Sequence, residues 1–163
     1  MSERAIYQGF ALNAVDAKGR VAIPAAFRSV IEANSDGRFV LIGRHEKDPC
    51  LSAFDRGWLR VRKDRIDRDE NLALAAGRPF DRLNEERRAF GQSEDLPFDA
   101  SGRFILPSIL RKRAGIELGG LAYFTGAGGT FEIWNPYTLL ETPGVDEWAK
   151  DNVRDLLEER GAA

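Results

Sequence analysis

Two short segments carry aspartate, glycine and arginine at the same spacing, Asp16 to Arg20 and Asp99 to Arg103. An arginine guanidinium can donate two hydrogen bonds to O6 and N7 of guanine, which is the commonest base-specific contact in protein–DNA complexes. Lys18, inside the first segment, is a compact charge suited to a phosphate. The two aspartates offer a second chemistry, because a carboxylate pair can carry out acid–base catalysis. The residue types therefore indicate recognition of nucleic acid, with acid–base chemistry as the weaker alternative.

The remaining residues of each segment predict a tight turn. An aspartate side chain can accept hydrogen bonds from the backbone that follows it, and glycine adopts a positive φ without steric cost. Asp16 and Asp99 would be repelled by a phosphate, so we expect them to brace the turns together with Gly19 and Gly102. An Asp–Arg pair that only pins each turn is the structural alternative, and we favour DNA contact for the two arginines.

The turns belong to an internal repeat, in which residues 16–28 return in register as residues 99–111. Two copies are too few for a solenoid, so we expect two halves related by a pseudo-two-fold axis. Each copy continues into apolar residues, a proline and a second arginine, Arg28 or Arg111. These two arginines sit in the first turns of a predicted helix, where contact with phosphate and pairing with a carboxylate are equally open.

Hydrophobic periodicity predicts strand, turn, strand and helix in each copy. Pro24 and Pro107 suit the first position of a helix. The helices should end near residues 36–37 and at Gly115, and the strands are expected at 9–15, 20–23, 39–42, 51–54, 96–98, 103–106, 121–125 and 130–134.

Helices are also predicted between and after the repeats. Residues 58–90 read as two helices separated at 77–79, with an apolar face on the second formed by Phe80, Leu83, Arg87 and Phe90. An acidic amphipathic helix follows Pro143, and its apolar stripe is expected to hold Val145, Trp148, Ala149, Leu156 and Leu157. Phe131 and Trp134 are expected to pack in the core or between subunits.

The repeat resembles the SpoVT/AbrB group of DNA-binding proteins. With both copies present, and with the segments 49–51, 113–116 and 131–134, residues 7–140 resemble the MraZ family of transcriptional regulators. The resemblance implies an α+β or mainly β fold, a swapped-hairpin AbrB-like barrel formed by two intrachain repeats, with peripheral helices and a C-terminal helix. The expected units are repeat 1 at 7–54, a helical connector at 55–89, repeat 2 at 90–137 and an acidic helical extension at 138–163.

The same resemblance implies a function. Such a protein is a sequence-specific repressor that binds double-stranded DNA at direct repeats upstream of its own division and cell-wall operon. It is cytoplasmic and nucleoid-associated, and forms a ring-like homo-oligomer, an octamer. The family pattern places Asp16, Lys18, Arg20, Asp99 and Arg103 towards DNA, and Ser101 in the position of Lys18 makes the second turn less cationic.

Composition permits this function without demanding it. The net charge is −2, but the residues from Glu141 onward hold seven acids and three bases, which leaves +2 for residues 1–140. A local basic patch can attract DNA while an acidic tail keeps the molecule soluble. The start of the chain lacks the pattern of a secretory signal, and the apolar runs are too short to span a bilayer, so we expect no membrane partner.

Other classes of function receive little support. The chain has one histidine, His45, and one cysteine, Cys50, which lies away from any paired motif and leaves no internal disulfide. Zinc-ligand spacing and a Gly-x-Ser-x-Gly motif are both missing. We therefore expect no enzyme, no metal, no cofactor and no small-molecule substrate. The alternative function is an antitoxin-like binder that grips a protein partner with residues 144–160.

Overall fold

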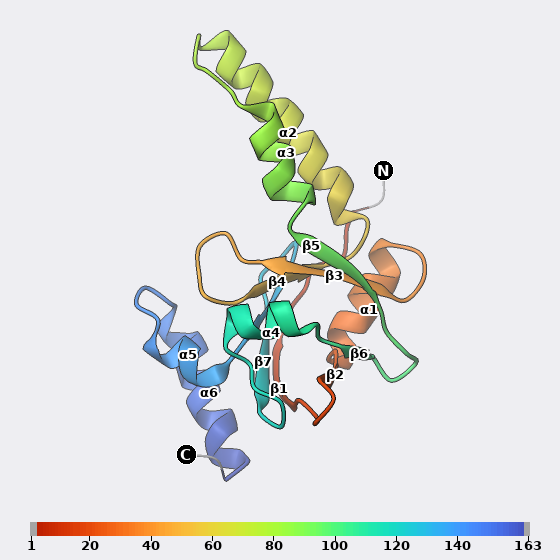
Figure 1. The fold of residues 1–163 in the computed structure, drawn as a ribbon, viewed down its shortest axis with the longest axis vertical. Helices are drawn as coiled ribbons and strands as arrows, with labels where there is room; N and C mark the ends of the chain where they lie inside the picture. Colours follow the sequence, from red (N-terminus) through yellow and green to blue (C-terminus); the bar gives the residue numbers. More distant parts are fainter. Residues whose placement is uncertain (1–2, 162–163) are drawn as a thin grey trace.

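The computed structural model describes residues 3–161, which form a mixed α/β fold with antiparallel strands (Figure 1). The strands of this part are β1 (Phe10–Ala14), β2 (Arg20–Ala22), β3 (Phe39–Arg44), β4 (Leu51–Phe54), β5 (Ser93–Pro97), β6 (Arg103–Ile105), β7 (Leu121–Gly126) and β8 (Phe131–Trp134). Its helices are α1 (Ala25–Asn34), α2 (Trp58–Ala75), α3 (Arg82–Phe90), α4 (Ser108–Ala114), α5 (Pro136–Glu141) and α6 (Glu147–Glu159).

The strands of the two repeats interleave. β1 of the first repeat pairs with β7 of the second, and β5 of the second pairs with β3 of the first. The resulting six-stranded sheet has the order β1-β7-β8-β4-β3-β5, while β2 and β6 pair with each other as a separate two-stranded ribbon. Because each repeat lends its first strand to the other, neither repeat completes its own sheet.

The β2–β6 ribbon lies on the pseudo-two-fold axis. Val21 pairs with Phe104, which holds the same place in the second repeat. The flanking hydrogen bonds are also related by this axis, since Ile23 N donates to Gly102 O and Leu106 N donates to Gly19 O, both at 2.9 Å. The predicted two-fold relation between the repeats is confirmed at this ribbon.

The two prolines mark the starts of helices, but each is the N-cap rather than the first helical residue that was predicted. Pro24 and Pro107 precede α1 and α4 with φ of −53° and −57°, values that the pyrrolidine ring favours. α4 ends at Gly115, whose φ of +67° suits glycine and closes the last turn. Each helix buries one apolar stripe, formed by Phe27 and Ile31 in α1 and by Leu110 and Ala114 in α4.

A single large core is shared by the repeats. Tyr7, Phe27 and Phe131 pack together within it as tilted rings, with ring centroids 4.8 Å apart for Phe27 and Phe131 and 5.1 Å apart for Tyr7 and Phe131. Trp134 is buried in a neighbouring cluster beneath α5 and α6. Phe131 and Trp134 therefore serve core packing, one of the two roles expected for them.

One carboxylate is fully buried. Asp55, directly after β4, accepts a hydrogen bond from the Tyr7 hydroxyl at 2.6 Å and two from the Arg4 guanidinium at 2.8 and 3.1 Å. Asn34 at the end of α1 and the Trp58 backbone N–H at the start of α2 also donate to it. Burial and Asp55 together raise the pKa of Tyr7, so the tyrosine stays protonated and donates.

Helices α2 and α3 form an arm that projects from the body (Figure 1). The two helices are joined by ion pairs, since Arg82 of α3 bonds Asp67 of α2 at 2.8 Å and Glu70 of α2 at 3.0 Å. Arg82 also bonds Glu86 of its own helix at 3.0 Å. The apolar face predicted for the second helix is wrong, because Leu83 and Arg87 are exposed and Phe90 is only partly buried. α3 packs against α2 and contains no buried residue, so its apolar positions face no hydrophobic core.

The C-terminal segment contains two helices rather than one. Residues 136–141 form α5, which the sequence did not predict, and α6 buries Val153 and Leu157. Trp148 was expected on the buried stripe, but its side chain is 80 % exposed, because the helical spacing sets it on the side of α6 opposite to the buried Val153 and Leu157. None of the helices within residues 3–161 is both long and apolar enough to cross a membrane.

Candidate functional site

Each Asp-x-x-Gly-Arg segment forms a turn built around its aspartate. Asp16 Oδ1 accepts the N–H groups of Lys18 and Arg20, both at 2.8 Å, and Oδ2 accepts the Arg20 Nε–H at 2.7 Å. Asp99 repeats this pattern with Ser101 N–H, Arg103 N–H and Arg103 Nε–H at 2.9, 2.9 and 3.1 Å. The aspartate thus holds the turn and fixes the direction of the arginine, while the terminal nitrogens of the guanidinium remain available to a ligand.

These bonds stabilise the charged form of both carboxylates. The hydrogen bond from the Arg20 side chain, supported by the backbone N–H of the same residue, lowers the pKa of Asp16 to about 2. The backbone N–H of Arg103 likewise holds the pKa of Asp99 below its ordinary value. Both aspartates are therefore ionised across the physiological pH range and paired with a cation, which leaves no proton for acid catalysis.

The Asp16 contact predicts an observable titration. Carbon-detected NMR should find Asp16 still ionised at pH 3, and its midpoint should move up towards 3.8 in Arg20→Ala. The stabilisation from this group is present above pH 3.8 and is lost as the pH falls towards 2, because the folded-state pKa is the lower one. A midpoint that does not move in Arg20→Ala would show that the arginine does not hold the carboxylate.

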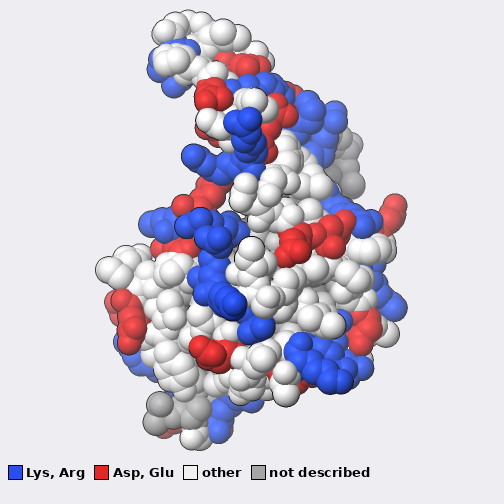
Figure 2. Space-filling view, in the orientation of Figure 1, with Lys and Arg blue, Asp and Glu red and all other residues white. Residues whose placement is uncertain are grey.

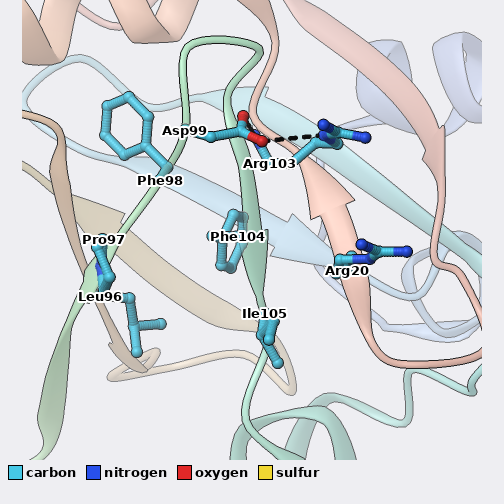
Figure 3. A pocket seen from close by; sticks show the side chains of 8 residues that line it. All are labelled: Arg20, Leu96, Pro97, Phe98, Asp99, Arg103, Phe104 and Ile105. Carbon is cyan, nitrogen blue, oxygen red and sulfur yellow. Dashed lines mark hydrogen bonds and ion pairs between the residues drawn. The ribbon is translucent and has the colours of Figure 1, made fainter.

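The ribbon connects the two turns, which lie at its opposite ends. Strand side chains alternate between faces, and Val21 and Phe104 point inward into the core. The outward residues are Arg20 and Ala22 of β2 and Arg103 and Ile105 of β6, and we call this set the ribbon face. Figure 3 shows both arginine side chains extending from the adjacent strands, with Arg103 bonded to Asp99.

The second pair of arginines, Arg28 and Arg111, lies close to the two turn glycines. Gly19 and Gly102 have φ of +86° and +82°. A Cβ at Gly102 would come within 2.5 Å of Arg28 Cδ, and one at Gly19 within 3.5 Å of Arg111 Nε. Arg28 and Arg111 therefore cross beneath the turn of the opposite repeat. Neither makes an ion pair with a carboxylate within residues 3–161, and Arg111 Nε is buried there without a hydrogen-bond partner.

Charge on the visible surface is divided into small groups. Figure 2 shows Lys and Arg side chains gathered in separate clusters on the body, with Asp and Glu between them, and both signs along the arm. Lys18 and Ser101 are exposed at equivalent places in the two turns. The face shown in Figure 2 therefore carries no single broad basic surface.

A hollow lies beside the second turn, that of Asp99 and Arg103. It has a volume of about 530 Å³ and is lined by Arg20, Asp99, Arg103 and apolar residues of β5 and β6 (Figure 3). Asp16 is not among the lining residues, so the hollow does not bring the two aspartates together. The carboxylate pair considered for acid–base catalysis does not form a shared site.

Cys50, expected to lie alone, has two polar neighbours that the sequence did not reveal. Ligand atoms of His45, Cys50 and Glu132 lie within 4.8 Å of one another. His45 Nδ1 accepts the N–H groups of Lys47 and Asp48, which places the proton on Nε2, and Nε2 lies 3.0 Å from Glu132. With both nitrogens so engaged, the cluster ties the β3–β4 hairpin to β8 and offers no imidazole lone pair to a metal.

Curated proteins with related sequences cover most of the chain. Transcriptional regulator MraZ of Rhodospirillum rubrum is 35 % identical over 132 residues, 81 % of each chain. The proteins of the same name from Ruegeria pomeroyi and Paraburkholderia xenovorans are 33 % and 30 % identical, over 92 % and 93 % of this chain and 90 % and 99 % of their own. No family model matches the chain. These relatives are named as regulators of transcription rather than as enzymes, and the chain belongs to their family, MraZ.

Proposed function

We propose that the protein is a sequence-specific DNA-binding repressor of transcription. The observation that carries the proposal is the ribbon face, where Arg20 and Arg103 project outward and each is aligned by its own aspartate. A two-stranded ribbon fits the major groove, and an arginine held in a fixed direction can donate two hydrogen bonds to guanine. The pairing with aspartate lowers the entropy lost when the guanidinium meets a base.

The other site residues are proposed to support this contact. Lys18 at the tip of the first turn would bind a phosphate, and Ser101 would contribute only a neutral hydrogen bond at the matching place. Arg28 and Arg111 lie beneath the turns, which supports a role in holding the opposite turn, with phosphate as the further partner for their free nitrogens. Asp16, Gly19, Asp99 and Gly102 brace the two turns.

The wider organisation is also a proposal, drawn from the family. The interleaved strands support a swapped-hairpin barrel of the SpoVT/AbrB type, with repeats at 7–54 and 90–137, a connector at 55–89 and an extension at 138–163. We place the protein in the cytoplasm at the nucleoid, assembled as an octameric ring that binds direct repeats upstream of its own division and cell-wall operon. Linked weak sites gain affinity through effective concentration, which accounts for DNA binding at a net charge of −2.

The test is binding of the purified protein to the DNA upstream of its gene, beside scrambled DNA of equal length, over a salt series. The upstream fragment should bind more tightly at every salt concentration, and the logarithm of the binding constant should fall linearly with the logarithm of salt. Shortening the fragment to a single repeat should weaken binding sharply, because the linkage between sites is lost. Equal binding of the two DNAs would contradict the proposal.

A second candidate function has one observation in its favour. Trp148 is 80 % exposed at the start of α6, and large exposed aromatic side chains are frequent anchors of protein interfaces. This supports the antitoxin-like alternative, in which the C-terminal helix grips a small protein. Purification of the protein from its own cells distinguishes the two, since the alternative requires a stoichiometric partner that Trp148→Ala releases.

A further inference from the structure

The ribbon face contains an apolar side chain that the repeat does not require. The pairing register sets Arg20 opposite Ile105 and Ala22 opposite Arg103. Ile105 holds the place in the second repeat that Ala22 holds in the first, so the face is asymmetric at this position. The Ile105 side chain is 60 % exposed although it lies beside two arginines. Because Ile105 lies beside both arginines of the candidate binding face, its exposed side chain is placed to touch a ligand that the arginines bind.

The surroundings of Ile105 form an apolar recess. Ile105 lines the hollow of about 530 Å³ together with the apolar residues Leu96, Pro97, Phe98 and Phe104 (Figure 3). The charged residues of the lining are Arg20, Arg103 and Asp99, and the Asp99 carboxylate is paired with Arg103. The first repeat has Asn13 and Ala14 where the second has Leu96 and Pro97, so this apolar character belongs to one half of the face. The recess therefore fits a small apolar group that lies next to hydrogen-bond acceptors.

In the major groove of DNA, the small apolar group that fits this recess is the methyl group of thymine, and the acceptors beside it are those of a neighbouring guanine. Guanine presents the acceptors O6 and N7, and thymine presents the only methyl group on a base-pair edge. We infer that Ile105 contacts the 5-methyl group of a thymine next to the base pair read by Arg20. This rests on the proposed function, and it deepens that function by assigning a specificity-determining residue. Ala22 is too short for the equivalent contact, so only one thymine per ribbon is read in this way.

Replacement of thymine by deoxyuridine tests the inference, because it removes the methyl group and preserves base pairing. Single substitutions through the bound fragment should reveal one position per repeat at which affinity falls about fourfold, the value of one buried methyl group. Ile105→Ala should bind the unmodified fragment about fourfold more weakly and should be indifferent to the substitution at that position.

Ile109→Ala is the matched control. Ile109 is also an exposed isoleucine, 62 % accessible, but it lies on α4 outside the ribbon face. This variant should keep both the affinity and the sensitivity to deoxyuridine of the parent protein. Circular dichroism and melting temperature check that both variants fold, and Ile105→Val, which keeps a branched side chain, should retain part of the sensitivity.

The outcomes separate the inference from the function on which it rests. Selective binding of the upstream DNA with no position sensitive to deoxyuridine would overturn the contact and leave the repressor proposal standing. Sensitivity that persists in Ile105→Ala would overturn the assignment to this residue. Absence of selective binding by the parent protein would remove the proposed function, and the inference with it.

Discussion

Replacement of Arg20 and Arg103 together by alanine should abolish selective binding to the upstream DNA. Each arginine is worth about 1–3 kcal/mol of base discrimination, so the pair should account for a loss of roughly thirtyfold or more. Folding should survive, because both ion pairs with aspartate are exposed, and water and salt screen such pairs so that they contribute little to stability. The measurement is the binding constant for upstream and scrambled DNA, with the melting temperature taken in parallel.

Two further variants show whether geometry or charge is responsible. Lysine at both positions keeps the charge but cannot donate the paired hydrogen bonds, so Arg20→Lys with Arg103→Lys should retain non-selective binding and lose selectivity. Alanine at Arg60 and Arg154, which are exposed and paired with nearby aspartates outside the ribbon face, should leave selectivity unchanged. If the double alanine variant binds as selectively as its parent, the turns are structural only.

Asp55→Ala should cause the largest loss of stability of any single carboxylate change. It would leave the buried Tyr7 hydroxyl and the Arg4 guanidinium without their partner, and removing one member of such a network costs about 3–5 kcal/mol. For a protein of this size that corresponds to a fall in melting temperature of roughly 6–20 °C. Thermal unfolding followed by circular dichroism measures the effect.

Asp95→Ala is the control for this experiment. Asp95 also bonds an arginine, Arg56, at 2.7 Å, but both side chains are largely exposed. Its loss should cost at most about 1 kcal/mol, because water replaces the partner. Similar melting temperatures for the two variants would mean that burial of Asp55 adds nothing to the stability of the network.

Local features of the sequence predicted much of the candidate site. The Asp-x-x-Gly-Arg turns and the helices after Pro24 and Pro107 depend on the preferences of neighbouring residues, and the structure places them close to the expected bounds. The internal repeat also predicted the two-fold relation, which the pairing of Val21 with Phe104 confirms. Whether Arg20 and Arg103 contact DNA stays a prediction.

Features that depend on contacts between residues far apart in the chain could not be predicted from the sequence. The pairing of β1 with β7 joins segments far apart in the chain, and no local pattern specifies that partner. The exposed Trp148 and Leu83 belong to helices that pack on one narrow side, so periodicity alone overstated their burial. The burial of Asp55 could not be predicted from the sequence, because its partners Arg4 and Tyr7 come from a segment without regular structure.

The exchange of first strands also governs how the protein can be made. During synthesis β1 leaves the ribosome long before β7 exists, since residues 15–120 must be translated between them. At a rate of about 5–20 residues per second this interval lasts roughly 5–20 s. Throughout it, β1 has no partner, and the hydrogen-bonding edge that it presents is open to any other nascent chain. Assembly of the sheet is therefore a late event, completed only when the second repeat has emerged.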